Sequence, residues 1–321
     1  MKHLLCATAL VALTVPVAAQ DKAVDIMKQM RDALGGDKLT QVKALALEGP
    51  FAREMGQRQM TGTLVLTLQA PDRMHRSEDV EMMAGMSMER TSVLAGDKAW
   101  EDMQNRGGMG GGMQIVMRGP GSAELNPEQL EQARVRRLRN EFNRYALAFL
   151  GGHNLQPTFV AVAEAPEGKA DVLEIKNEAG QSTRIFVDQS THMPLMLQYT
   201  EVRPRINMMG GPGGPGGPGG RRGGPGGGGA PGAGRPDGPP LGGGAGGGQR
   251  PTPEEVARRR EQMPPPVPSA VTLYLGDFKK VDGVLLPHRL TQSVEGKTIE
   301  EWTIEKVKVN PNVKADLFEK K

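Results

Sequence analysis

Short segments with strand-like patterns follow one another along most of this chain, separated by turn residues rather than by helices. Residues 61–69 alternate between apolar and polar side chains, and residues 93–100 have a hairpin pattern with Gly96-Asp97 at the turn. Further strand patterns occupy 158–164, 171–176, 182–188, 194–201, 270–275, 284–294 and 298–309. Strands joined by short turns pair antiparallel, because parallel strands need a long crossover between them. The sequence therefore predicts an α+β fold with an antiparallel sheet.

Two helical segments remain to cover one face of this sheet. The first spans residues 21–34, where four apolar side chains share one helical face (Ala23, Met27, Met30 and Leu34), and a short helix over 37–43 follows Gly35-Gly36. The second is long, with Asn126 as its cap, Pro127 in its first turn and Gly151-Gly152 at its end. Its apolar stripe consists of Leu130, Leu138, Phe142, Tyr145 and Phe149. Its arginines lie off this stripe, and we expect them to form a solvated face: Arg134, Arg136, Arg137, Arg139 and Arg144.

The first nineteen residues have the pattern of an export signal. A short basic start precedes an apolar run, and Val17-Ala18-Ala19 places small residues where a signal peptidase cleaves. The single cysteine, Cys6, lies in this segment, so the mature chain would have no thiol and no disulfide. No later apolar run reaches membrane-spanning length. We expect a protein that is exported to the periplasm and is soluble there, with no transmembrane segment in the mature chain.

A glycine- and proline-rich run interrupts the strand patterns. Residues 210–250 hold 23 of the 44 glycines and 8 of the 25 prolines of the chain. Such a composition is typical of a flexible segment without a packed core, and the arginines within it make it weakly basic. Strand patterns resume after it, so we predict a disordered insert within one domain. The expected organisation is a signal at 1–19, a first domain part at 20–208, the insert at 209–266 and the closing strands at 267–321.

Charge and motifs exclude several functional classes. Lys and Arg number 40 against 37 Asp and Glu, a formal net charge of +3 that does not favour nucleic-acid binding. The sequence lacks a nucleophile elbow, a phosphate-binding loop and a zinc-protease helix motif. The four histidines of the expected mature chain are not spaced as metal ligands: His75, His153, His192 and His288. We therefore predict a protein that is not an enzyme, with no catalytic residues, no metal site and no cofactor.

Methionine is concentrated in one part of the chain. Nine methionines fall between residues 74 and 117. Thioether ligands suit Cu(I), and Met86-Ser87-Met88 offers two of them close together, so a periplasmic copper-binding protein is one hypothesis. Methionine also lines apolar surfaces that adapt to variable contents, and we favour that interpretation.

Four segments resemble the outer-membrane lipoprotein-sorting proteins of the Lol carrier type. Residues 62–74 resemble the strand, proline and strand of those carriers, and residues 93–100, which end in Trp100, resemble the following hairpin. Residues 282–287 resemble their penultimate strand, and residues 307–318, with Asn310-Pro311, resemble their ending. The sequence departs from the carriers at Ala70, where they have a basic residue, and in the long insert.

The resemblance implies an incompletely closed antiparallel half-barrel whose apolar concave face is covered by helices. Proteins of this kind hold lipid or lipoprotein acyl chains in the periplasm, so we expect a non-enzymatic binding or carrier protein with such chains, and envelope proteins, as partners. The candidate cavity residues are Leu64, Leu66, Leu68, Met86, Met88, Trp100, Phe142 and Phe149. Two alternatives stay open: the same residues pack the helices onto the sheet without a cavity, or the basic insert makes this an envelope interaction protein.

Overall fold

The computed structural model describes residues 17–56, 58–83, 86–106, 126–152, 155–166, 168–177, 180–202 and 268–320. The predicted insert at 209–266 lies outside these ranges. So does the predicted signal, except for residues 17–19, which begin helix α1. Both predictions therefore stay predictions.

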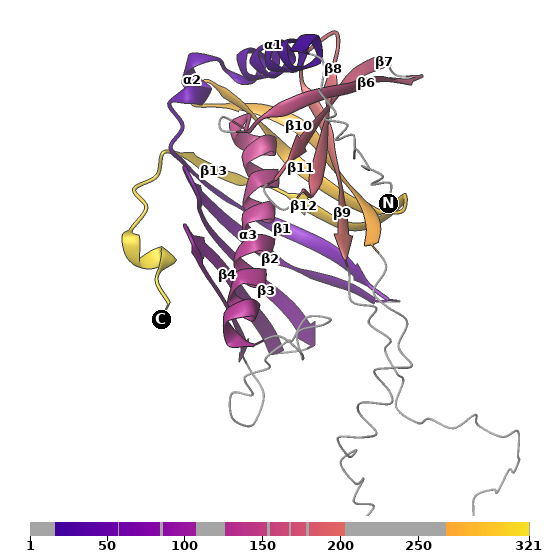
Figure 1. Ribbon diagram of the computed structural model, residues 1–321. Helices are drawn as coiled ribbons and strands as arrows, with labels where there is room; N and C mark the ends of the chain where they lie inside the picture. Colours follow the sequence, from indigo (N-terminus) through magenta and orange to yellow (C-terminus); the bar gives the residue numbers. More distant parts are fainter. Residues whose placement is uncertain are drawn as a thin grey trace, which may run out of the picture. The chain divides into compact units, whose positions relative to one another are not determined.

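Thirteen strands form one antiparallel sheet in the described part of the chain (Figure 1). The strands follow the order β5-β4-β3-β2-β1-β12-β11-β10-β9-β8-β7-β6, and β13 also pairs with β1. Their bounds are β1 (Ala44–Met55), β2 (Arg58–Gln69), β3 (Arg73–Met83), β4 (Met86–Ala95), β5 (Lys98–Arg106), β6 (Pro157–Ala165), β7 (Gly168–Lys176), β8 (Ser182–Asp188), β9 (Pro194–Val202), β10 (Pro268–Val281), β11 (Val284–Val294), β12 (Lys297–Thr303) and β13 (Lys306–Val309). The first and last strands of the order, β5 and β6, do not pair with each other, so the sheet is open. The predicted fold class, α+β with an open antiparallel sheet, is confirmed.

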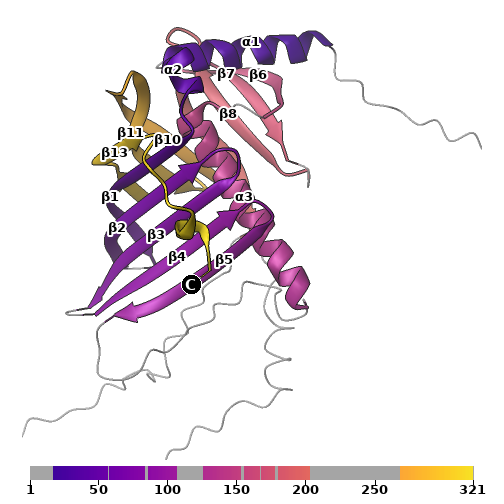
Figure 2. The same ribbon diagram turned by 90° about the vertical axis from the view of Figure 1, so that its left-hand side faces the viewer.

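The long helix α3 (Pro127–Leu150) crosses one face of the sheet. It contacts β4 and β5 near one end of the strand order and β9 and β11 farther along it. Since strands so far apart in the order touch one helix, the sheet curves around α3, as Figures 1 and 2 show. Helix α1 (Val17–Leu34) packs on β6 and β11, and the short α2 (Asp37–Thr40) follows it. The two long helices and the inner face of the sheet enclose one large apolar core.

The helix signals in the sequence are confirmed for the two long helices, whereas the short helix predicted over 37–43 ends at Thr40. Asn126 accepts a hydrogen bond from the Gln129 amide, and the Gln129 side chain accepts one from the Asn126 amide. Gly151 ends α3 in the left-handed conformation, at a φ of 63°. On α1, the four apolar side chains predicted to share a face are all buried: Ala23, Met27, Met30 and Leu34.

The predicted single strand at 298–309 is wrong, because the chain forms two strands there. Residues of β12 pair with the second half of β1, for example Trp302 with Phe51, and β13 pairs with its first half. At the break, the Glu305 amide donates to the Glu48 carbonyl and the Trp302 indole donates to the Gly49 carbonyl. A Cβ atom on Gly49 would lie 1.9 Å from the Thr303 carbonyl oxygen. Glycine at position 49 allows the backbones of β1 and β12 to approach each other. No strand was predicted from the sequence at β1.

Candidate functional site

Strand register identifies which side chains of the sheet face α3. Across β2 to β5, Leu66 lies opposite Arg76, Arg76 opposite Ser92, and Ser92 opposite Glu101. Arg76 and Glu101 both contact side chains of α3, at Glu141 and Arg137. The row that contains Leu66 therefore faces the helix. On each strand, the residues just before and just after the member of this row face away from the helix.

Most of the predicted cavity residues lie in the apolar core. Five are buried in one cluster (Leu64, Leu66, Leu68, Phe142 and Phe149), and Met88 is partly buried against it. The side chain of Met86 lies outside the described part of the structure. Trp100 precedes Glu101 and lies opposite Val93, so it occupies the outer face of the sheet and cannot line the same surface as Leu66. The C-terminal 3₁₀ helix η1 (Ala315–Phe318) covers the outer face at β3 and β4 (Figure 2).

A cluster of charges crosses the inner face of the sheet, where the sequence predicted an apolar surface. Glu78 on β3 accepts hydrogen bonds from the Arg53 guanidinium at 3.1 and 2.7 Å, and it also pairs with Arg76. Arg53 also pairs with Glu300 on β12, and Arg76 with Glu141 on α3, at 3.3 Å. Burial alone would raise the pKa of Glu78, which is only 2% exposed, but the two arginines outweigh it and lower the pKa to about 2. This buried carboxylate is therefore charged at neutral pH.

The expectation that the α3 arginines form a solvated face is wrong for most of them. Arg139 donates to the Gly96 carbonyl at 2.7 Å, and Arg134 donates to the Ala99 carbonyl at 3.4 Å. Arg137 pairs with Glu101 on β5. A local charge pattern does not show these partners, because the acceptors lie on β5 and in the β4–β5 turn, about 40 residues earlier in the chain.

On the opposite side of α3, an open cleft of about 360 Å³ lies between the helix and strands β7 to β9. Its floor includes one register row of the sheet, Ile175, Thr183 and Tyr199. The next row inward, Leu173, Ile185 and Leu197, belongs to the sealed core, and Ile175 of the floor row is buried in the same core. The described residues that line it are Ala133, Arg136, Arg137, Asn140, Asn143, Arg144, Leu147, Leu155, Ile175, Lys176, Asn177, Gln181, Ser182, Thr183, Tyr199, Thr200, Glu201 and Val202. None of the seven predicted cavity residues whose side chains the structure describes is among them.

The walls of this cleft are polar and cationic. From α3, Arg144 places its guanidinium 4.1 Å from the centre of the Tyr199 ring, and the Tyr199 hydroxyl accepts a hydrogen bond from Gln292 at 3.1 Å. Asn177 donates to Asn140 at 2.7 Å, which joins the β7–β8 turn to the helix. The result is a groove with an apolar floor and hydrogen-bonding walls.

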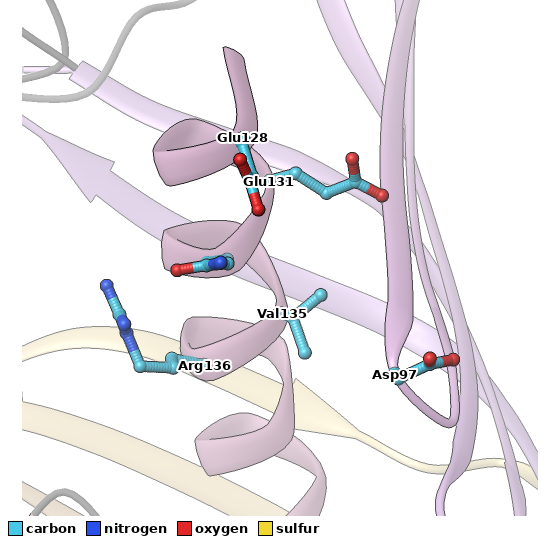
Figure 3. A pocket seen from close by; sticks show the side chains of 6 residues that line it. Asp97, Glu128, Glu131, Val135 and Arg136 are labelled. Carbon is cyan, nitrogen blue, oxygen red and sulfur yellow. The ribbon is translucent and has the colours of Figure 1, made fainter. Parts of the chain in front are cut away.

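A second cleft, of about 310 Å³, lies between the first turns of α3 and the β4–β5 turn (Figure 3). Its lining is Asp97, Glu128, Glu131, Gln132, Val135 and Arg136. In Figure 3 Val135 points toward Asp97 and Arg136 extends to the other side of the helix. Arg136 thus lines both clefts, whereas Asp97, Glu128 and Glu131 line this one and not the other.

Among the residues that the structure describes, no group of three or more histidine, cysteine or acidic side chains is placed to hold a metal ion. No helix in the described ranges combines the length and apolar character needed to cross a membrane.

No protein-family model and no curated protein sequence matches this chain. Solved structures are similar to it at low identity. One is a DUF1329 family protein from Desulfovibrio piger (10% identity, TM-score 0.45, covering 94% of this chain and 97% of the other). Another is a putative outer membrane lipoprotein-sorting protein domain from Vibrio parahaemolyticus (10% identity, TM-score 0.39, covering 93% and 97%). A third is a LolA superfamily protein from Nitrosomonas europaea (8% identity, TM-score 0.40, covering 93% and 98%).

Proposed function

We propose that this chain is a non-enzymatic periplasmic protein that binds or carries lipid or lipoprotein acyl chains, and that the cleft between α3 and β7–β9 holds the chain. The observation that carries the proposal is the apolar surface within that cleft. Tyr199 and Leu155 are half-buried and Val202 is 53% exposed, whereas Ile175 and Leu147, which also line the cleft, belong to the buried core. The site thus differs from the one that the sequence suggested around Leu66.

The dimensions of the cleft suit a single chain. Lining residues on α3 run from Ala133 to Leu147, which corresponds to about 20 Å of helix. Its volume of about 360 Å³ lies within the range typical of small-ligand sites. Each methylene group that leaves water contributes about 0.8 kcal/mol, so even a partly buried acyl chain gains useful affinity. Ligand binding of this kind needs no reacting group, which agrees with the absence of a catalytic motif in the sequence.

The first test is native mass spectrometry of protein purified from a periplasmic extract without detergent. We expect bound species with the masses of phospholipids or acylated peptides, released on denaturation. Thr183→Trp places a large ring on the cleft floor and should abolish the bound species, whereas Thr183→Val keeps the size of the side chain and should retain them. A clean mass of the protein alone, together with no uptake of added lipid, would overturn the proposal. An added mass of copper would instead favour the methionine hypothesis.

A further inference from the structure

The cationic groups of the cleft indicate what the head of its ligand should be. Arg136, Arg137, Arg144 and Lys176 all line it, against one carboxylate among the lining residues, Glu201. Glu201 already takes part in an interaction of its own, and Lys176 and Arg137 already have partners in Glu174 and Glu101. Arg136 and Arg144 are the two other cationic residues of the lining.

Neither of these two arginines forms an ion pair with a carboxylate among the residues that the structure describes. The arginines of the inner sheet face behave differently: Arg53 and Arg76 each contact two carboxylates. Arg144 rests on the Tyr199 ring, which orients its guanidinium over the cleft without neutralising its charge. Arg136 is exposed and extends from α3 on the side away from Asp97 (Figure 3).

We propose that the cleft selects ligands with an anionic head, a phosphate or a carboxylate attached to an apolar chain, and that Arg136 and Arg144 recognise that head. This inference rests on the proposed function, because it assigns the polar end of the ligand whose apolar end occupies the floor. A guanidinium presents planar pairs of N–H donors that match the oxygens of phosphate and carboxylate. Arg136 and Arg144 lie on the wall that α3 forms, and Tyr199 and Leu155 contribute apolar surface to the same cleft. The cleft therefore combines cationic and apolar groups, as an amphiphile requires.

The two arginines are two turns apart on α3, about 12 Å along the axis. At that spacing each arginine attracts an anion separately. We therefore expect the single variants Arg136→Gln and Arg144→Gln each to lose part of the preference for ligands with an anionic head. The double variant should lose all of it.

The test compares two detergents with the same chain, dodecyl phosphate and dodecyl maltoside, both below their micelle concentrations, by isothermal titration calorimetry. For the unmodified protein we expect dodecyl phosphate to bind about tenfold more tightly than the uncharged maltoside at low salt. In the Arg136→Gln, Arg144→Gln double variant this preference should disappear while the affinity for dodecyl maltoside stays the same. The Arg58→Gln, Arg289→Gln double variant, which removes two exposed arginines outside the cleft lining, is the matched control for net charge and should keep the preference.

The remaining outcomes separate this inference from the proposed function. Equal affinity of the unmodified protein for the two detergents would overturn the inference that the ligand has an anionic head, but it would leave the proposal of acyl-chain binding intact. Binding of neither detergent would overturn both. Inorganic phosphate that binds as tightly as dodecyl phosphate would show that the apolar floor contributes nothing, which also overturns the inference. Circular dichroism of each variant before titration shows whether it is folded.

Discussion

Arg76 on β3 and Glu141 on α3 form an ion pair, with 3.3 Å between the guanidinium Nη1 and the carboxylate Oε1. Both side chains are largely withdrawn from water, at 13% and 14% exposure. Arg76 also pairs with Glu78, which Arg53 contacts in turn, so a chain of charges runs from β1 through β3 to the helix. The helix is therefore held on the sheet by buried charge pairs as well as by apolar packing, and the predictions below test both.

Glu78→Gln should destabilise the protein by about 3 kcal/mol. The carboxylate balances two buried guanidinium groups, Arg53 and Arg76, and its removal leaves them with only their outer partners, Glu300 and Glu141. The measurement is the free energy of unfolding from urea titration. Glu164→Gln is the control, because Glu164 pairs with Lys169 at the surface and such pairs contribute less than about 1 kcal/mol. Equal effects of the two variants would contradict the structural role given to Glu78.

The contribution of Glu78 should depend on pH. Its pKa is lowered from 4.5 to about 2 in the folded protein, so protonation favours the unfolded state. The stabilisation is complete above pH 4.5, the unfolded pKa, and is lost as the pH falls toward about 2. Since one pKa unit corresponds to 1.36 kcal/mol, the effect is again about 3 kcal/mol. Unfolding free energies of the unmodified protein and of Glu78→Gln should therefore converge as the pH falls from 4.5 to about 2, and a constant difference would contradict this assignment.

Leu66→Ala should cost about 2–5 kcal/mol, because Leu66 is fully buried in the core and its truncation leaves a cavity. If Leu66 lined an empty ligand cavity, the loss would be much smaller and lipid retention would change instead. Leu195→Ala is the control, since Leu195 is 42% exposed. Thermal unfolding in the absence of lipid distinguishes the two roles.

Gly49→Ala should destabilise the protein by at least about 2 kcal/mol, because the new Cβ atom would collide with the Thr303 carbonyl oxygen. Gly276 lies on the nearby strand β10, and a Cβ atom there would be 4.0 Å from the Arg289 carbonyl oxygen. Gly276→Ala should therefore be tolerated. If both alanine variants unfolded at the same urea concentration, the close approach of β1 and β12 would not be essential.

Local patterns in the sequence predicted most elements of the fold. The alternation in 61–69, the turn at Gly96-Asp97 and the cap at Asn126 each depend on residues close together in the chain. For that reason they could be recognised before the structure was known. Strand β1 was missed, since Gly49 and Pro50 interrupt its pattern, and it is held by partners on both sides, β2 and β12.

The candidate site was harder to predict from the sequence than the fold. Hydrophobicity identified Leu64, Leu66 and Leu68 correctly as inward-facing residues, but it could not distinguish a sealed core from a ligand cavity. It also placed Trp100 with them, whereas the register of β4 and β5 puts this side chain on the outer face. The arginines of α3 were expected in water because their partners are far away in sequence: Arg139 and its acceptor Gly96 are 43 residues apart.

The hairpins and the two long amphipathic helices follow from local sequence, because they depend on side-chain periodicity and on caps within a few residues. The curvature of the sheet around α3, the pairing of arginines with carboxylates and the open cleft beside the core arise only in the folded molecule. Those outcomes depend on register and on contacts between distant segments, and a shift of one residue in any strand would turn every side chain of that strand to the other face.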